Sequence, residues 1–340
     1  MSEKINRQFR LRSRPSNRIE ASNFDFVKGK MPTPGPGQAL VRVLYLSLDP
    51  TNRIWMSDRE QYMPPVEIGE VMRGGGIGVV VRSKSSRFRE GDRVVGLTGW
   101  QDYCLVDEGA PAMRVLPADL PVPLPTMLGA CGMTGLTAYF GLLDLGRPQP
   151  GETVVVSAAA GAVGSVAGQI AALKGCRTVG IAGGKDKCRH LLEELGFDAA
   201  VDRKAADWKE QLARATPDGV DVNFENVGGE IMQAVMARMN LFSRMPLCGL
   251  ISGYNASEPM LGDFGAILIK RISVRGFIVL DFAERYSEGT GQLVQWVAEG
   301  RIKHRETIVD GLERAPSAIN MLFDGSNFGK LIVKVSDPDD

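Results

Sequence analysis

The first part of the chain carries short apolar runs that are separated by Gly, Pro and Asp. Three of them are ALVRVLYLSL at 39–48, GIGVVV at 76–81 and DRVVGL at 92–97. Runs of this length between turn residues are typical of β-strands, and no long helical period interrupts them. Residues 1–125 are therefore predicted to be rich in β-structure.

From Met127 onward the pattern changes to alternating strands and helices, which predicts a parallel sheet. We expect strands at 153–157, 177–182, 199–201, 220–224, 244–249 and 272–279. We expect helices between them at 164–174, 186–195, 206–215, 230–240 and 262–270. A last helix at 312–323 and a strand at 330–335 complete the pattern. The change near residue 127 marks the predicted domain boundary.

Bulk composition favours a two-domain globular enzyme. The 340 residues are too many for one compact core. Lys plus Arg equals Asp plus Glu at 40 each, so we expect no partner among nucleic acids and no attraction to an anionic membrane. The five cysteines are scattered without a C-x-x-C pair, which argues against a disulfide framework and favours the cytoplasm.

Two uncharged runs, 120–143 and 154–173, are long enough to suggest membrane spans. The first is interrupted by prolines, and the second changes midway from β-branched residues to Ala and Gly. We interpret both as buried core and expect no membrane segment.

The stretch VVVSAAAGAVGSVAGQIAALKG at 154–175 has the order strand, glycine turn, helix. The dinucleotide fingerprint G-x-G-x-x-G would place its first glycine at 159, where this chain has Ala159. Gly161 and Gly164 can supply the second and third roles, which are close backbone approach to a pyrophosphate and close helix–strand packing. The following helix directs its amides at phosphates. The alternative is a tight strand–helix turn that binds nothing.

The end of the second expected strand favours NADPH over NADH. An NAD site usually has a carboxylate there for the ribose 2′-hydroxyl, but this chain has Gly183 and Gly184 followed by Lys185 and Lys187. Asp186 complicates the pattern unless it points outward. Arg203, after the third strand, could add a second positive charge near a 2′-phosphate.

Other chemistries lack their residues. The only histidines, His190 and His304, have no partner at a metal-ligand spacing, so no metal site is predicted. The chain has no Tyr-x-x-x-Lys, no G-x-S-x-G and no P-loop. Hydride transfer without metal assistance remains, with the protein positioning the substrate and stabilising developing negative charge.

Several segments together carry a family resemblance. They are LSLDPTNR at 46–53, GMTGLTAYFGL at 132–142, AAAGAVGSVAGQIAALKGC at 158–176, NVGGE at 226–230, CGLISGYN at 248–255 and NFGKLIVKV at 327–335. With them the chain resembles the zinc-independent medium-chain dehydrogenase/reductases. Within that family it is similar to the group of leukotriene/prostaglandin reductases, 2-alkenal (double-bond) reductases and bacterial curcumin reductases.

The resemblance implies an α/β fold, with a Rossmann doubly wound parallel sheet and a GroES-like β-rich domain. It implies a substrate domain at 1–127, an NADP-binding domain at 128–305 and a segment at 306–340 that returns to the substrate domain. Cofactor and substrate would meet between the two domains. It also implies a homodimer, for which the strand SVRGFIV at 273–279 is a candidate pairing edge.

The resemblance also assigns roles to individual residues. It implies that Lys187 binds the 2′-phosphate of NADPH and that Arg203, where relatives often have tyrosine, lies near the same group. Further cofactor contacts are implied for Gly161, Ala162, Val163, Gly164, Asn226, Phe277, Ile278, Val279 and Asn327. The loop along the nicotinamide comprises Cys248, Gly249, Leu250, Ile251, Ser252, Gly253 and Tyr254.

Tyr254 resembles the tyrosine that the family places beside the substrate carbonyl. A phenol at the carboxyl end of a strand can donate a hydrogen bond to a forming enolate. The alternative is a loop tyrosine that packs on the cofactor without a catalytic role.

We therefore expect NADPH-dependent reduction of the C=C bond of enones and enals, with hydride delivered to the β-carbon. A quinone reductase of the same superfamily and a non-catalytic NADPH-binding protein are the alternatives.

Overall fold

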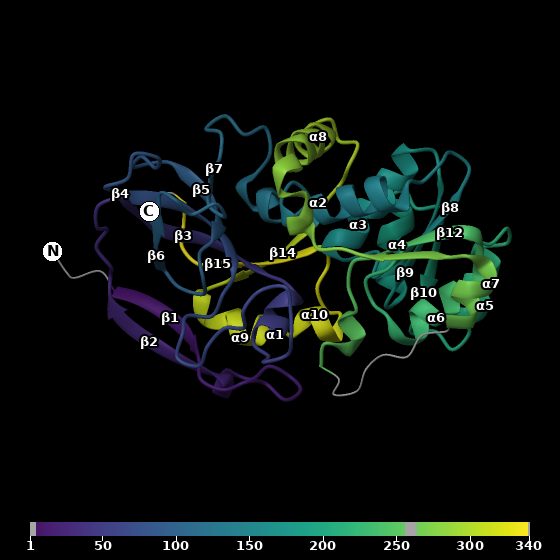
Figure 1. The fold of residues 1–340 in the computed structure, drawn as a ribbon, viewed down its shortest axis with the longest axis horizontal. Helices are drawn as coiled ribbons and strands as arrows, with labels where there is room; N and C mark the ends of the chain where they lie inside the picture. Colours follow the sequence, from purple (N-terminus) through teal and green to yellow (C-terminus); the bar gives the residue numbers. More distant parts are fainter. Residues whose placement is uncertain (1–4, 256–263, 339–340) are drawn as a thin grey trace. The chain divides into compact units, whose positions relative to one another are not determined.

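The computed structural model describes residues 5–255 and 264–338. The chain divides into two compact units. In Figure 1, where colours follow the sequence, unit 1 contains the purple N-terminal part and most of the yellow C-terminal part, and unit 2 is mainly teal and green. Unit 1 comprises Met1–Leu128, Glu306–Ser326 and Leu331–Asp340, and unit 2 comprises Gly129–Arg305 and Asn327–Lys330. Both units therefore contain residues from distant parts of the sequence.

Unit 1 is rich in β-structure, which confirms the prediction for the N-terminal part. Its seven-stranded sheet has the order β14 (Glu306–Asp310), β15 (Lys330–Lys334), β3 (Gln38–Leu48), β4 (Gly75–Ser83), β5 (Arg93–Leu97) and β7 (Arg114–Val115), and β6 (Tyr103–Asp107) also pairs with β3. A separate antiparallel pair consists of β1 (Ile5–Leu11) and β2 (Phe24–Lys30). Buried side chains of these strands and of the short helix α1 (Thr51–Trp55) share one apolar core.

Unit 2 contains a six-stranded sheet in which each strand is parallel to its neighbours. The order is β10 (Ala199–Asp202), β9 (Arg177–Ala182), β8 (Thr153–Ser157), β11 (Val220–Phe224), β12 (Met239–Leu247) and β13 (Ser273–Gly276). This is the Rossmann order, in which the direction of winding reverses between the first and fourth strands. The predicted parallel sheet is confirmed, and its switch point lies between β8 and β11.

Helices cover both faces of this sheet. Apolar side chains from α5 (Trp208–Ala215), α6 (Gly229–Arg238) and α7 (Phe264–Lys270) pack on one face. On the other face, a Cβ atom at Gly180 of β9 would meet Leu191 of α4 (Lys185–Glu193) at 2.6 Å, which shows how closely that helix approaches. The helices α2 (Met133–Phe140), α3 (Ala162–Leu173) and α8 (Tyr286–Ala298) contact one another in series.

Several predicted boundaries are wrong. β12 begins at Met239, inside the helix expected at 230–240, and β13 ends at Gly276 instead of 279. The helix expected at 312–323 is broken into a turn and two short helices, α9 (Ala315–Ala318) and α10 (Met321–Asp324). Proline is tolerated only in the first turn of a helix, and Pro316 forces α9 to begin there. Residues 262 and 263 of the expected helix at 262–270 lie outside the described residues.

The helix α8 was not expected at all, because Gly289 and Gly291 weaken its helical signal. Gly289 is needed for packing, since a Cβ atom there would lie 2.6 Å from Leu136 of α2. With 13 residues, α8 is the longest helix in the described part of the chain, and none of those helices is long and apolar enough to cross a membrane.

Candidate nucleotide-binding and active site

The turn after β8 is short and held by backbone hydrogen bonds. The amide of Gly161 donates to the carbonyl of Ala158 at 2.9 Å, and Gly161 is the N-cap of α3. The amide of Ala159 donates to the carbonyl of Ile181 in β9 at 3.0 Å. The first amides of α3 have no carbonyl of a preceding turn to bind, so the turn presents donors at the carboxyl edge of the sheet.

The structure answers the question raised by Ala159. The residue with a left-handed backbone is Ala158, with φ +49°, whereas Ala159 has no positive φ. Its methyl group is buried and lies 2.9 Å from where a Cβ atom at Gly180 would be. The glycine absent at 159 is thus compensated by the glycine at 180, which makes room for the methyl group. At Gly164 a Cβ atom would lie 2.5 Å from the carbonyl oxygen of Ala158, so the close packing expected of the third glycine is present.

The segment Asn327–Lys330 is paired with this turn. The amide of Gly329 donates to the carbonyl of Ala160 at 3.0 Å, and Gly161 forms a parallel bridge with Gly329. The Asn327 side chain is buried and donates to the carbonyl of Gly329 at 3.0 Å. The segment that carries Asn327 is therefore brought beside the glycine turn, although the two are distant in sequence.

The tip of β9 carries no side chain at Gly183 and Gly184, and cations surround it. Lys187 in the first turn of α4 is half-buried, whereas the Asp186 side chain is 81% exposed and pairs with Arg189 at 3.3 Å. The outward direction considered for Asp186 is thus the observed one. The Arg203 guanidinium Nε lies 3.2 Å from where a Cβ atom at Gly183 would be, so this glycine leaves room for the arginine.

One carboxylate near this tip was missed from the sequence. Asp202 ends β10, and its Oδ1 accepts the amides of Gly184 at 2.7 Å and Lys204 at 3.0 Å. The negative charge is held by backbone amides at the turn. The signal was present in the sequence as V-D-R after the third strand, but the hydrogen bond depends on how β10 pairs with β9.

A second carboxylate that was missed from the sequence is Glu225, which is fully buried directly after β11. It accepts the Ser157 hydroxyl at 2.8 Å, the Asn223 side chain at 3.0 Å, and the amides of residues 227 and 228 at 2.7 and 2.8 Å. Ser157 in turn accepts the Asn226 amide at 2.8 Å, and the Asn226 side chain donates to the Ser157 carbonyl at 2.7 Å. Asn226 is therefore fixed between the carboxyl ends of β8 and β11.

The loop that follows β12 is attached to the same edge. The amides of Cys248 and Gly249 donate to the carbonyl of Glu225 at 2.9 and 3.1 Å. The phenolic oxygen of Tyr254 accepts the amide of Leu250 at 3.3 Å and lies over Gly249, 3.3 Å from where its Cβ atom would be. Ile251, Ser252 and Gly253 form a single helical turn before it. The loop residues thus gather where the tyrosine was expected, at the carboxyl end of a strand.

Burial, together with the negative charge of Glu225, raises the pKa of Cys248 to about 12. A thiol with this pKa remains protonated near neutral pH, which excludes it as a thiolate nucleophile.

The structure does not continue β13 to the residues expected beside the nicotinamide. Phe277 and Ile278 follow the end of the strand, and Val279 begins a 3₁₀ turn. The Phe277 ring is buried near Phe282, with 6.3 Å between ring centroids, and close against Gly141. The strand predicted to continue to residue 279 therefore ends at Gly276, and the buried Phe277 lies beyond it.

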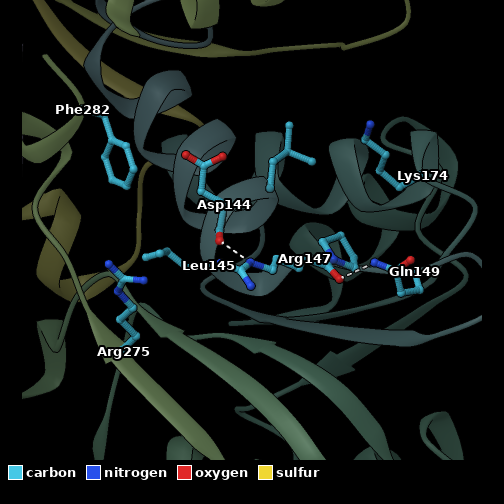
Figure 2. Close-up of a pocket in the computed structure, with 9 residues that line it drawn as sticks. Asp144, Leu145, Arg147, Gln149, Lys174, Arg275 and Phe282 are labelled. Carbon is cyan, nitrogen blue, oxygen red and sulfur yellow. Dashed lines mark hydrogen bonds between the residues drawn. The ribbon is translucent and has the colours of Figure 1, made fainter. Parts of the chain in front are cut away.

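A shallow pocket of about 670 Å³ lies elsewhere in unit 2 (Figure 2). Its lining comes from the chain before β8, the end of α3, β13 and the turn after it, and it includes Leu143, Asp144, Arg147, Gln149, Lys174 and Arg275. None of the predicted site residues lines it. It lies towards the amino end of β8, away from the glycine turn, so it is not the nucleotide site.

In the described part of the chain, no group of three or more His, Cys, Asp or Glu side chains could hold a metal ion. The five cysteines all lie in the described part of the chain, and none of them forms a disulfide. A glycine turn at the switch point of a Rossmann sheet, with cations at the tip of the second strand, defines the class as a dinucleotide-binding α/β protein.

Comparison with known proteins identifies the family. The N-terminal domain of oxidoreductase matches residues 7–115, and the zinc-binding dehydrogenase domain matches residues 162–298. The chain is 46% identical to NADPH-dependent curcumin reductase of Escherichia coli (strain K12), over 98% of each chain. It is 42% identical to prostaglandin reductase 1 of Rattus norvegicus, over 92% of this chain and 94% of the relative.

Among solved structures, CurA of Vibrio vulnificus in complex with NADPH matches with a TM-score of 0.93 and 47% identity. The match covers 98% of this chain and all of the other. The chain belongs to the medium-chain dehydrogenase/reductase family of oxidoreductases, and to its group of curcumin, prostaglandin and alkenal reductases.

Proposed function

We propose that the protein uses NADPH to reduce the C=C bond of α,β-unsaturated ketones and aldehydes. The observation that carries the choice of NADPH is the end of β9, where Gly183 and Gly184 have no side chains, Arg203 lies against Gly183, and Lys187 follows in the first turn of α4. Relatives named as NADPH-dependent curcumin reductase and as 2-alkenal reductase, the latter 38% identical over 91% of this chain, support the reaction class.

The backbone turn after β8 would hold the pyrophosphate. Gly161 to Gly164 begin α3, where unpaired amides and the positive end of the helix dipole favour an anion. Because Gly164 has no Cβ atom, the helix can lie close to the turn. Asn327 and Asn226, fixed on either side, complete the contacts that we assign to the dinucleotide. The bound nicotinamide supplies the hydride.

Tyr254 would stabilise the substrate at the oxygen that gains negative charge. Hydride addition at the β-carbon of an enone makes an enolate, and a phenol can donate a hydrogen bond to that oxygen. The contact between Tyr254 and the amide of Leu250 orients the phenol in the loop. Protonation of the α-carbon, by solvent or by Tyr254, completes the reduction. We expect the shape of the loop at 253–265 to help determine which substrate is accepted, and residues 256–263 of this loop lie outside the described residues.

Lys187→Ala should raise the KM for NADPH about 10- to 100-fold, the scale of a lost charge-assisted hydrogen bond. The KM for NADH should change little, because NADH lacks the 2′-phosphate. The matched control is Lys185→Ala, which removes an exposed lysine from the same helix turn. Initial rates with both cofactors measure the effect, and equal changes with NADPH and NADH would contradict the assignment.

Tyr254→Phe should lower kcat for an enal about 10- to 1000-fold, as expected for a lost donor to a developing oxyanion. Tyr139→Phe is the control, because that phenol hydrogen-bonds Glu288 and lies on α2, outside the candidate site. Steady-state kinetics at saturating NADPH make the comparison. Unchanged turnover in Tyr254→Phe would leave the residue as a packing tyrosine.

The quinone reductase alternative is tested by substrate preference, since quinones and enones both accept hydride at a carbon conjugated to a carbonyl. NADPH oxidation, followed by absorbance, should be faster per enzyme with medium-chain 2-alkenals and enones than with benzoquinone. A reversed preference would favour the quinone reductase. NADPH binding without oxidation across the whole panel would favour a non-catalytic protein.

We also propose a homodimer formed through the edge of the sheet in unit 2. β13 is an edge strand, and all four of its residues are exposed. Near it, apolar side chains are exposed on β12 and α7: Leu241, Phe242, Phe264, Leu268 and Ile269. Pairing of two β13 strands across a two-fold axis would cover an otherwise open edge. Light scattering should give twice the 36.8 kDa of one chain, and a monomer at micromolar concentration would contradict the proposal.

A further inference from the structure

Phe328 belongs to the segment Asn327–Lys330, which is paired with the glycine turn, and its ring lies against Lys187 of α4. The Lys187 ammonium lies 5.3 Å from the centroid of the Phe328 ring, and the guanidinium carbon of Arg305 lies 4.6 Å from it. The His190 ring meets Phe328 edge-on, with centroids 5.7 Å apart. One half-buried ring thus contacts two cations and a buried histidine.

The backbone that carries this ring is held in place by the two residues after it. Gly329 has φ +56°, and a Cβ atom there would lie 1.8 Å from the carbonyl oxygen of Arg305. The amide of Lys330 donates to that same carbonyl at 2.9 Å. With Gly329 bonded to Ala160 as well, the residue before it is held in place. Phe328 is therefore anchored at its backbone, and its ring lies against the Lys187 ammonium.

We infer that Phe328 is a positioning residue, which holds the Lys187 ammonium for the 2′-phosphate and thereby sets the preference for NADPH over NADH. The inference rests on the proposed function, because it requires that Lys187 binds this phosphate. A lysine is a point charge on a flexible four-carbon chain, so its geometry depends on what the chain packs against. A ring face attracts the ammonium and removes many of its alternative rotamers.

Arg305 shares the ring and is the competing explanation. If the ring acted through Arg305, removing the ring would have the same effect whether or not Lys187 is present. His190 also contacts the edge of the ring, and its Nδ1 lies 3.1 Å from a carboxylate oxygen of Glu194. The proposed role of Phe328 does not require His190 to reach the tip of β9. The experiment must therefore separate the two cations.

Phe328→Leu keeps an apolar side chain but removes the ring face. The Kd of NADPH, measured by titration calorimetry, and the KM for NADPH should both rise about three- to tenfold, the range for a partly exposed cation–π contact. The KM for NADH and both kcat values should stay within about twofold of the wild type, since the chemistry is untouched. Phe328→Tyr, which keeps the ring, should restore the KM for NADPH. NADH-dependent turnover shows that the variant has folded.

A double-mutant cycle completes the test. In a Lys187→Ala background Phe328→Leu should have no further effect on the KM for NADPH, whereas in Arg305→Ala its effect should persist. Equal rises for NADPH and NADH, additivity with Lys187→Ala, or loss of the effect in Arg305→Ala would each overturn the inference. If Lys187→Ala alone does not change the cofactor preference, the 2′-phosphate assignment itself fails. An effect of Lys187→Ala without one of Phe328→Leu would overturn the role of Phe328 alone.

Discussion

The hydrogen bond from the Gly329 amide to the Ala160 carbonyl joins the segment Asn327–Lys330 to the turn that follows β8. It fixes the backbone directly after Asn327 and Phe328. The Asn327 side chain donates a hydrogen bond to the carbonyl of Gly329, and the Phe328 ring contacts Lys187 of α4. The segment Asn327–Lys330 thus contacts both the turn after β8 and Lys187 of α4.

Close approach of backbone to backbone is the condition for this arrangement. A Cβ atom at Gly164, Gly180 or Gly329 would meet a neighbour at 3 Å or less, so each glycine is needed for space. Ala159 is accepted only because Gly180 makes room in the adjacent strand. The glycine fingerprint therefore reflects the limited volume between two strands and a helix. A methyl group is tolerated at one position of the turn when the adjacent strand has a glycine beside it.

The fold was largely predictable because its signals are local. β8, β9 and β11 lie at the residues expected, since apolar β-branched runs between glycines rarely form anything else. The helix α8 and the end of β13 were not predictable, because Gly289 packs against Leu136 of α2 and Phe277 packs against Gly141, and both contacts join residues distant in sequence. Tertiary packing overrides local propensity at both places.

The candidate site divides in the same way. The glycine turn and the cations near Gly183 could be found from sequence because they follow strand ends directly. Glu225, Asp202 and Phe328 could not, because each acts through partners that only the sheet order brings near: Ser157 from β8, Gly184 from the end of β9, and Lys187 from α4. The sequence shows that Glu225 lies between Asn223 and Asn226, but it does not show that this carboxylate is buried.

Titration calorimetry with two fragments of the cofactor tests the central claim most directly. ADP-ribose and its 2′-phosphate both lack the nicotinamide, so only the turn after β8 and the tip of β9 are measured. We expect both to bind, and the 2′-phosphate to bind at least about tenfold more tightly, as a charge-assisted contact predicts. Equal affinities, or no heat from either compound, would contradict a site built to hold a pyrophosphate beside a 2′-phosphate.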